Sequence, residues 1–591
     1  MDYKTFNEHI NKFNEKFCNN ELKFRKYQKE IILDALNTFF NTNKKTYVYE
    51  GPVGSGKSIV GIIFSYVANQ LGKTGYILTS ELSLQDQYES DFEKFKIGFH
   101  GVKGVDNYIC TENGEKYSIG DCTMRNIPYN QRKKLHCYKH CPYLAAREKA
   151  IHSPTTLLNY SYHLIQRNYV AKNFEEEPFK IRDFVICDEG HKIVNIIQNH
   201  FSPRIDILTN EKLEKLRRFI KSKNFGDVKS TPNALSKTID NIFIEDNKDI
   251  LYNHLFDFEY HLSNFETSAS NIKEFIAKKY RNKTIPKDWR SGMFLVDWVK
   301  DMHCKFEDYN EIIKNTGIDS LIKNKSEESV VFNCLDESYL MEKHFHNETG
   351  FKLIMSATFG NPKSYIKNTK ISNAKFIRSK SIFNFDKSPI YVFSGKKMNY
   401  NSKDLNFPWV VKKIEEITNL HQKESGIIHT GSYEFARKLN EMISDDIRNR
   451  FLFYGNSEEK KILLEEFYKG KDKILIGPSI LEGVDFYDER SRFQIFMKVP
   501  YLNLANNFVK EKMIKDQDWY NNKAILHILQ GIGRSVRNEN DWAKTYILDG
   551  CFVDLFKRNQ DAFSKEIYNR LIWVSYDNKN WNNVKSIKIN I

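Results

Sequence analysis

A glycine-rich run, GPVGSGKS, occupies residues 51–58 and fits the pattern G-x-x-x-x-G-K-[ST] in full. An apolar segment with strand character, KTYVYE, precedes it, and a helical pattern follows it. This order predicts a phosphate-binding loop, because backbone N–H groups at a helix N-terminus cradle phosphates. We expect Lys57 to neutralise the β- and γ-phosphates and Ser58 to bind Mg²⁺. The glycines that let the backbone approach the nucleotide closely are Gly51, Gly54 and Gly56.

The pattern of apolar segments predicts two α/β units with two interruptions. Strand-like segments at 45–50, 74–80 and 184–189 alternate with helical patterns. Such alternation predicts a doubly wound parallel sheet whose ligand lies at the carboxyl ends of the strands. Residues 95–150 break the alternation, and 195–345 break it again with long, charged, amphipathic helical patterns. The strand pattern then resumes with 352–358, 426–430, 450–455, 473–479, 493–499 and 545–550.

DEGH, residues 188–191, directly follows the apolar strand FVIC. A carboxylate at the end of such a strand can hold the Mg²⁺ of a bound nucleotide. We expect Asp188 to hold that ion, Glu189 to orient and deprotonate the attacking water, and His191 to relay the state of the nucleotide to neighbouring segments. Two acidic residues after a strand are in isolation more often helix caps. The complete phosphate loop upstream favours the catalytic interpretation.

Four of the nine cysteines fall within a short segment: Cys110, Cys122, Cys137 and Cys141. Their thiolates suit either Zn²⁺ or an iron–sulfur cluster. The spacing leaves both open, because only Cys137 and Cys141 form a close pair and two histidines flank them. The odd cysteine count, without an N-terminal signal segment, argues against a disulfide framework.

The charge balance is basic, with 90 Lys and Arg against 76 Asp and Glu and a net charge of +14. A polyanion partner explains this balance, because Lys and Arg contacts to phosphates release counterions; a basic surface kept for solubility explains it equally well. No segment reaches the roughly 18 unbroken apolar residues of a membrane span. We therefore expect a soluble, cytoplasmic protein with no membrane partner. The Asn-, Lys- and Ile-rich composition suggests an AT-rich genome, and the compact length suggests a bacterial or viral source.

Further segments, in order along the chain, resemble the motifs of superfamily 2 helicases, and within them the XPD/DinG-like group with a cysteine-bound iron–sulfur cluster. FRKYQ resembles the adenine-reading motif, YILTSELSLQDQ a nucleic-acid motif, and KGVDNYIC the lead-in to the first cluster cysteine. LLNYSYHL resembles the segment after the cluster, and MSAT the motif that links hydrolysis to movement. HTGSYEFA, ILEGVDF and QGIGRSVR resemble motifs of a second motor lobe.

The resemblance implies roles for residues at matching positions. Ser356 and Thr358 would act with His191 in coupling. The four clustered cysteines would hold a [4Fe–4S] cluster that braces a small strand-separating domain, with zinc as the alternative. Tyr108 is placed beside nucleic acid, although packing within the cluster domain explains it equally well. Further nucleotide-binding positions are Arg25, Gln28, Gly483 and Asp485, and the other nucleic-acid positions are Thr79, Ser80, Ser432 and Tyr433.

QGIGRSVR also has a physical rationale at the catalytic site. Charge spreads over the γ-phosphoryl oxygens in the transition state, and an arginine finger stabilises it. Arg534 and Arg537 are three residues apart, so on a helix they share a face. An R-x-x-R pair is often just a solvated helix face, but Gln530 upstream favours a catalytic role. We expect these residues to reach from the second lobe into the ATP cleft of the first.

The fold class implied is α/β: two RecA-like motor lobes of parallel sheets flanked by helices, an inserted iron–sulfur domain and a mostly helical arch domain. The first lobe would comprise residues 1–95, 151–194 and 346–380. The iron–sulfur domain would span 96–150, the arch 195–345, and the second lobe 381–591.

The function implied is an ATP-dependent DNA helicase that uses Mg²⁺ and moves 5′ to 3′ on single-stranded DNA. Its substrates would be tailed or forked duplexes, with an RNA–DNA hybrid as a further substrate, and it would act as a monomer. Two alternatives stay open. One is a nucleic-acid remodeller or clamp without processive unwinding. The other is an RNA helicase, because motifs that contact the backbone separate ribose from deoxyribose poorly.

The sequence departs from the family pattern at two glycines. Gly190 stands in DEGH where the common form has alanine, and we expect hydrolysis to survive that change. Gly550 stands after Asp549 where the family often has arginine, which puts one expected basic contact in doubt.

Overall fold

The computed structural model describes most of the chain. The described residues are 1–19, 21–125, 127, 129–171, 178–223, 231–280, 285–380, 385–454, 456–478, 486, 488–536, 541–578 and 581. Three predicted site residues, Gly483, Asp485 and Arg537, lie outside these ranges. Within the described ranges, no helix is both long and apolar enough to cross a lipid bilayer.

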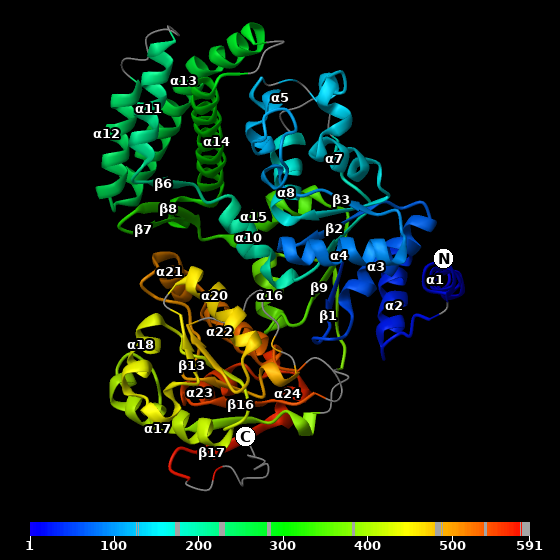
Figure 1. Ribbon diagram of the computed structural model, residues 1–591, viewed down its shortest axis with the longest axis vertical. Coiled ribbons are helices and arrows are strands. Elements are labelled where there is room, and N and C mark those ends of the chain that lie inside the picture. The colour runs from blue at the N-terminus through cyan, green and yellow to red at the C-terminus, as the bar shows by residue number, and fades with distance from the viewer. Residues whose placement is uncertain are drawn as a thin grey trace.

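A seven-stranded parallel sheet forms the core of the first lobe (Figure 1). The predicted strands are there, and each is buried along its whole length, as expected for a sheet covered on both faces. Three further strands, β3, β4 and β10, are not predicted by the sequence pattern. In spatial order the strands are β10 (Ala374–Arg378), β1 (Thr46–Glu50), β9 (Phe351–Ser356), β5 (Phe184–Cys187), β2 (Gly75–Thr79), β4 (Thr155–Asn159) and β3 (His100–Gly101).

Three helices lie next to the loops that follow the first lobe's strands. Helix α3 (Lys57–Gln70) begins directly at the end of the phosphate loop. Helix α2 (Gln28–Asn41) packs beside α3, and α4 (Leu82–Phe95) follows β2. Strands β1, β5 and β9 are neighbours at the centre of the sheet, so the loops that follow them meet at one edge.

A second seven-stranded parallel sheet forms the second lobe, drawn in yellow to red in Figure 1. Its five predicted strands are there, and β11 and β17 extend it. Helix α22 (Gln517–Ile532) lies on the side that faces the first lobe. In spatial order the strands are β13 (Phe451–Phe453), β14 (Ile474–Gly477), β12 (Gly426–His429), β15 (Phe493–Phe496), β16 (Lys544–Ile547), β11 (Ile390–Ser394) and β17 (Leu571–Ser575).

Two segments project from the first lobe (Figure 1). One holds the cysteine group and the short helices α5 (Asp121–Met124), α6 (Tyr129–Arg132) and α7 (Pro142–His152). The other is a helical bundle that rests on a small antiparallel sheet, which the sequence pattern does not predict. Its elements are β6 (Arg204–Asp206), α11 (Thr209–Ser222), α12 (Thr231–Ile244), α13 (Lys248–Lys279), α14 (Lys287–Thr316), β7 (Leu321–Lys325) and β8 (Ser329–Cys334).

Candidate nucleotide cleft between two lobes

A cavity of about 480 Å³ lies between the two lobes. Its first-lobe wall includes the phosphate loop, the end of β2, the DEGH segment and the MSAT segment. Its second-lobe wall includes the end of α22 and the short helix α24 (Lys565–Arg570). Eight of the predicted site residues line it: Gly54, Lys57, Ser80, Glu189, His191, Thr358, Gln530 and Arg534. The structure therefore gathers segments from both halves of the chain around one cavity.

The phosphate loop adopts a conformation that requires its glycines. Gly54 and Gly56 have positive φ values of 78° and 75°, a region that other residues rarely occupy. A β-carbon at Gly56 would lie 2.5 Å from the Gln28 amide nitrogen. That amide donates a hydrogen bond to the Gly56 carbonyl oxygen at 3.1 Å. Gln28 thus braces the loop from α2, while Arg25 is exposed and its backbone N–H donates to the Gln28 side chain.

Lys57 lies at the centre of the cavity, and its ammonium donates to the Gly51 carbonyl oxygen at 3.2 Å. The carboxylates of Asp188 and Glu189 are close enough for Lys57 to lower the pKa of both. For Asp188, burial and the neighbouring Glu189 charge prevail and raise the pKa. For Glu189, burial acts to raise the pKa, but hydrogen bonding to His191 and the nearby cations lower it below its usual value.

Tyr88 connects two groups that the sequence assigns to one metal ion. Its buried hydroxyl donates to the Asp188 carboxylate at 2.8 Å, and the Ser58 hydroxyl is near enough to affect the Tyr88 pKa, which burial raises. Ser58 and Asp188 therefore converge on one point beside the phosphate loop.

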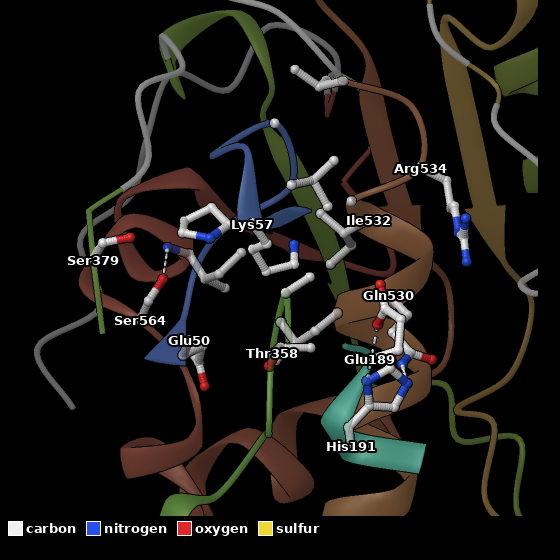
Figure 2. Close-up of a pocket in the computed structure, with 18 of the residues that line it drawn as sticks. Glu50, Lys57, Glu189, His191, Thr358, Ser379, Gln530, Ile532, Arg534 and Ser564 are labelled. Atoms are coloured by element: carbon white, nitrogen blue, oxygen red, sulfur yellow. Dashed lines mark hydrogen bonds and ion pairs between the residues drawn. The ribbon is translucent and has the colours of Figure 1, made fainter. Parts of the chain in front are cut away.

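His191 joins the two lobes. Its Nδ1 lies 2.8 Å from the Ser356 hydroxyl oxygen and 3.2 Å from the Glu189 carboxylate. Its Nε2 lies 2.5 Å from the Gln530 amide nitrogen of the second lobe. All these contacts are satisfied when Nδ1 carries the proton and Nε2 accepts from Gln530. Figure 2 shows the Gln530 and His191 side chains pointing toward each other beside Glu189.

Ser356 and Thr358 form a tight turn behind His191. The Ser356 hydroxyl donates to the Thr358 carbonyl oxygen at 2.8 Å, and the Thr358 hydroxyl accepts from the Gly360 N–H at 3.0 Å. The Ser356 carbonyl oxygen accepts the N–H of Gly51, the first residue of the phosphate loop, at 2.9 Å. The turn is thus bonded directly to the loop that would hold the phosphates.

The Arg534 side chain lies on the cavity wall but is not aimed at Lys57. Figure 2 shows its guanidinium on the far side of Gln530 from Lys57. The preceding Gly533 is closer to the loop, because a β-carbon there would lie 3.1 Å from a Val53 methyl group. The end of α22 therefore abuts the phosphate loop while its arginine points away.

Glu50 and Arg378 also line the cavity and are not among the residues that the sequence motifs identify. Glu50 ends β1, is 6% exposed, and pairs with Arg378 at the end of the neighbouring strand β10 at 2.5 Å. Burial raises the Glu50 pKa, and the Arg378 guanidinium opposes that effect. A charged residue at the end of an otherwise apolar strand is the sequence signal that could have identified Glu50.

The residues predicted to contact nucleic acid are scattered in the structure. Thr79 is fully buried and its hydroxyl donates to the Glu81 carbonyl oxygen, so it presents no surface here. Ser80 lines the nucleotide cavity. Ser432 caps helix α18 (Tyr433–Met442) by accepting the Phe435 N–H at 3.1 Å, whereas Tyr433 is 41% exposed.

Tyr108 packs inside the cysteine segment. Its ring meets the Tyr143 ring edge to face at 5.4 Å, and its hydroxyl accepts the Lys103 N–H at 3.1 Å. These contacts favour the packing explanation over the nucleic-acid one.

The four clustered cysteines lie near one another. Burial, Glu112 and the other three thiols raise the Cys137 pKa to about 11. Three of the four are buried, and a β-carbon at Gly120 would lie 3.2 Å from the Cys110 sulfur. Among the residues that the structure describes, no group of three or more Cys, His, Asp or Glu side chains has the spacing of a formed metal site.

Both departures from the family pattern have a steric reason. A β-carbon at Gly190 would lie 2.2 Å from a methyl group of Ile354 on β9. A β-carbon at Gly550 would lie 2.9 Å from the Lys396 carbonyl oxygen, and the Gly550 N–H donates to the same atom. In both places the neighbouring chain occupies the space that a side chain would need.

Two parallel-sheet lobes, with a phosphate loop in the first and a cavity between them, define a two-lobed α/β protein of the nucleotide-binding class. Comparisons with known proteins agree. Residues 21–208 match the family model of the type III restriction enzyme res subunit, and residues 414–570 match that of the helicase C-terminal domain. A probable ATP-dependent helicase of Methanocaldococcus jannaschii is 22% identical over 92% of this chain and 95% of its own.

A regulator of telomere elongation helicase 1 homolog of Drosophila grimshawi is 21% identical over 75% of this chain, which spans about half (54%) of that relative. Among solved structures, an XPD helicase aligns with a TM-score of 0.61 at 16% identity, covering 94% of this chain and all of that one. Xpd4 of S. tokodaii aligns with a TM-score of 0.58 at 15% identity, covering 93% and 100%. These matches identify the chain as an ATP-hydrolysing helicase that binds nucleic acid, and its fold is similar to that of the XPD structures.

Proposed function

We propose that this helicase couples ATP hydrolysis to 5′-to-3′ movement on single-stranded DNA and so separates a duplex ahead of it. The observation that carries the proposal is the contact of Gln530 with His191. It joins the second lobe to a histidine that also bonds the catalytic Glu189 and the Ser356 turn. A change at the γ-phosphate that moves Glu189 or Ser356 would therefore be felt by the second lobe. The net charge of +14 and the family resemblance favour DNA as the track.

The residues around the cavity have separable roles in hydrolysis. Lys57 would bind the β- and γ-phosphates, and Glu189, kept ionised by its neighbours, would take a proton from the attacking water. Ser58 and Asp188 would hold Mg²⁺, and the Tyr88 hydroxyl lies beside both of them. Bound Mg²⁺ neutralises charge on the phosphate oxygens. Arg534 and Arg537 would approach the γ-phosphate when the lobes close around ATP.

We propose that the cysteine group holds a [4Fe–4S] cluster. Cys110, Cys122, Cys137 and Cys141 supply four thiols. Burial and the neighbouring thiols raise the pKa of Cys137 and of Cys141, and a cluster reverses that effect because it binds thiolates. The cluster would brace the 96–150 segment opposite the helical bundle. Zinc on the same thiols is the alternative. Iron and acid-labile sulfide in anaerobically purified protein would support the cluster, and zinc without iron would overturn it.

The test of the motor is strand displacement with ATP and Mg²⁺ on duplexes with either a 5′ or a 3′ single-stranded DNA tail, with Lys57→Ala as control. We expect displacement from the 5′ tail and none in the control. Displacement from the 3′ tail alone would overturn the polarity. ATP hydrolysis stimulated by DNA without displacement would favour a remodeller or clamp. Stronger competition by RNA than by DNA oligonucleotides would favour an RNA helicase.

A further inference from the structure

Helix α22 of the second lobe touches the first lobe at several points besides Gln530. Asp516 caps its start, and the carboxylate pairs at 2.7 Å with Lys367 of helix α16 (Pro362–Thr369). Gly533, at its end, approaches Val53 of the phosphate loop. Between these points Asn522 faces the segment that follows the MSAT turn.

The Asn522 amide binds that segment with both of its polar atoms. Its oxygen accepts the Asn361 N–H at 2.6 Å, and its nitrogen donates to the Phe359 carbonyl oxygen at 3.3 Å. The side chain is 6% exposed, so both bonds are shielded from water. One side chain of the second lobe thus holds three consecutive residues of the first.

Gly360 makes this contact possible. Its φ is +66°, and a β-carbon there would lie 2.1 Å from the Asn522 amide oxygen. A residue with a side chain at position 360 would be strained and would push the two lobes apart at this point.

The segment that Asn522 holds is bonded on its other side to the nucleotide machinery. The Phe359 N–H donates to Glu50, immediately before the phosphate loop, at 3.0 Å. The Ser356 hydroxyl contacts His191 at 2.8 Å. On α16, the Tyr365 hydroxyl donates to the Gly190 carbonyl oxygen at 2.9 Å. Residues 356–361 therefore lie between the ATP-sensing groups and Asn522.

We propose that Asn522 is a positioning residue that transmits movement of residues 359–361 to the second lobe and so couples hydrolysis to nucleic-acid movement. It acts through the backbone that it binds, and it is not among the residues that line the cavity. This assignment rests on the proposed motor function.

Asn522→Ala tests the assignment, with Asn521→Ala as the matched control. Asn521 lies on the same helix, is equally buried, and accepts a hydrogen bond from Gln517 of that helix. Four quantities are measured: ATP hydrolysis without nucleic acid, hydrolysis with single-stranded DNA, strands displaced per ATP hydrolysed, and the midpoint of thermal unfolding. We expect Asn522→Ala to keep basal hydrolysis while DNA stimulation and strands displaced per ATP fall about tenfold, as losing two shielded hydrogen bonds implies. Asn521→Ala keeps all four values.

Gly360→Ala breaks the same contact from the first lobe. Because both changes act on one interaction, their losses should not multiply in the double variant. The assignment would be overturned if Asn522→Ala displaced as many strands per ATP as the wild type, or if Asn521→Ala lost as much. It would also be overturned if the losses multiplied in the double variant. A fall in basal hydrolysis that followed a fall in the unfolding midpoint would overturn it as well. Failure of the unmodified protein to respond to DNA would instead overturn the motor function together with this assignment.

Discussion

The Gln530 amide nitrogen of the second lobe lies 2.5 Å from His191 Nε2 of the first, 339 residues earlier in the chain. His191 uses its other ring nitrogen to contact Ser356 and Glu189. A single imidazole thus joins the group assigned to activate water, the turn beside the phosphate loop and the second lobe. When the Gln530 amide nitrogen donates to Nε2, Nδ1 carries the proton that faces Ser356 and Glu189.

Gln530→Ala should weaken nucleic-acid-stimulated ATP hydrolysis about tenfold or more, because the second lobe loses its hydrogen bond to His191. Binding of ATP to the isolated protein should change little, since Lys57 and the loop that bind the phosphates are intact. Steady-state hydrolysis with and without DNA, together with a nucleotide-binding titration, measures both effects. Gln517→Ala, at the start of the same helix, is the control. Hydrolysis at the wild-type rate in Gln530→Ala would contradict the link.

Gly190→Ala should destabilise the protein even though alanine is the common family residue at this position. The new methyl group would meet Ile354 at 2.2 Å, and overpacking of this kind costs about 1–3 kcal/mol. Ile354→Ala removes the opposing methyl group and leaves a cavity. We therefore expect the double variant to lose less free energy of unfolding than the sum of the losses in the two single variants, as measured by denaturant unfolding. Simple additivity would show that the two positions do not compete for space.

The central strands can be predicted from the sequence because they are buried on both faces. Strand β5 is fully buried, and its FVIC segment is a continuous apolar run. Strand β10 is half-exposed at every position and lies at the edge of the sheet, so its AKFIR segment carries no such run. The small antiparallel sheet is hard to predict for a related reason, because β7, LIKNK, is polar at one end and follows the long helix α14.

Some residues of the candidate site can likewise be predicted from the sequence, and others cannot. Lys57, Glu189, His191 and Gln530 belong to local motifs whose residue types reveal their chemistry, and the structure places them around one cavity. Asn522 belongs to no motif. Its partners are backbone atoms of a segment 161 residues away, and only the packing of one lobe on the other brings them together. The arginine motif also does not predict where its side chain points, since the Arg534 guanidinium points away from Lys57 in this conformation.

The proposed iron–sulfur cluster predicts that replacing one of the four clustered cysteines removes bound iron. In Cys122→Ser, a hydroxyl replaces a thiolate ligand, and we expect iron and the visible absorbance of the cluster to be lost together with strand displacement. ATP hydrolysis without DNA should persist, because the cysteine segment lies outside the nucleotide cavity. Cys18→Ser, in helix α1 (Tyr3–Cys18) and far from the cluster in sequence, is the control. Full iron content in Cys122→Ser would exclude it as a ligand.

Asp516 provides a test of how α22 is fixed against the first lobe. It caps the helix by accepting the Trp519 N–H at 3.0 Å and pairs with Lys367. Burial acts to raise the Asp516 pKa, but Lys367 and the Trp519 N–H outweigh it and lower the pKa below the ordinary value of 3.8. Since the folded pKa is depressed, this carboxylate stabilises the fold above about pH 4 and loses that contribution as pH falls through the folded value.

Asp516→Asn should therefore keep the cap, because asparagine caps helices well, but lose the ion pair and its pH dependence. Asp516→Ala should lose the cap as well, at a further cost of about 1 kcal/mol. Unfolding midpoints of the three proteins, measured between pH 7 and pH 3, separate the contributions. The wild-type advantage over Asp516→Asn should shrink as the pH falls, while the gap between the asparagine and alanine variants stays constant. A wild-type advantage that persists undiminished at low pH would show that the charge on Asp516 does not stabilise the lobe contact.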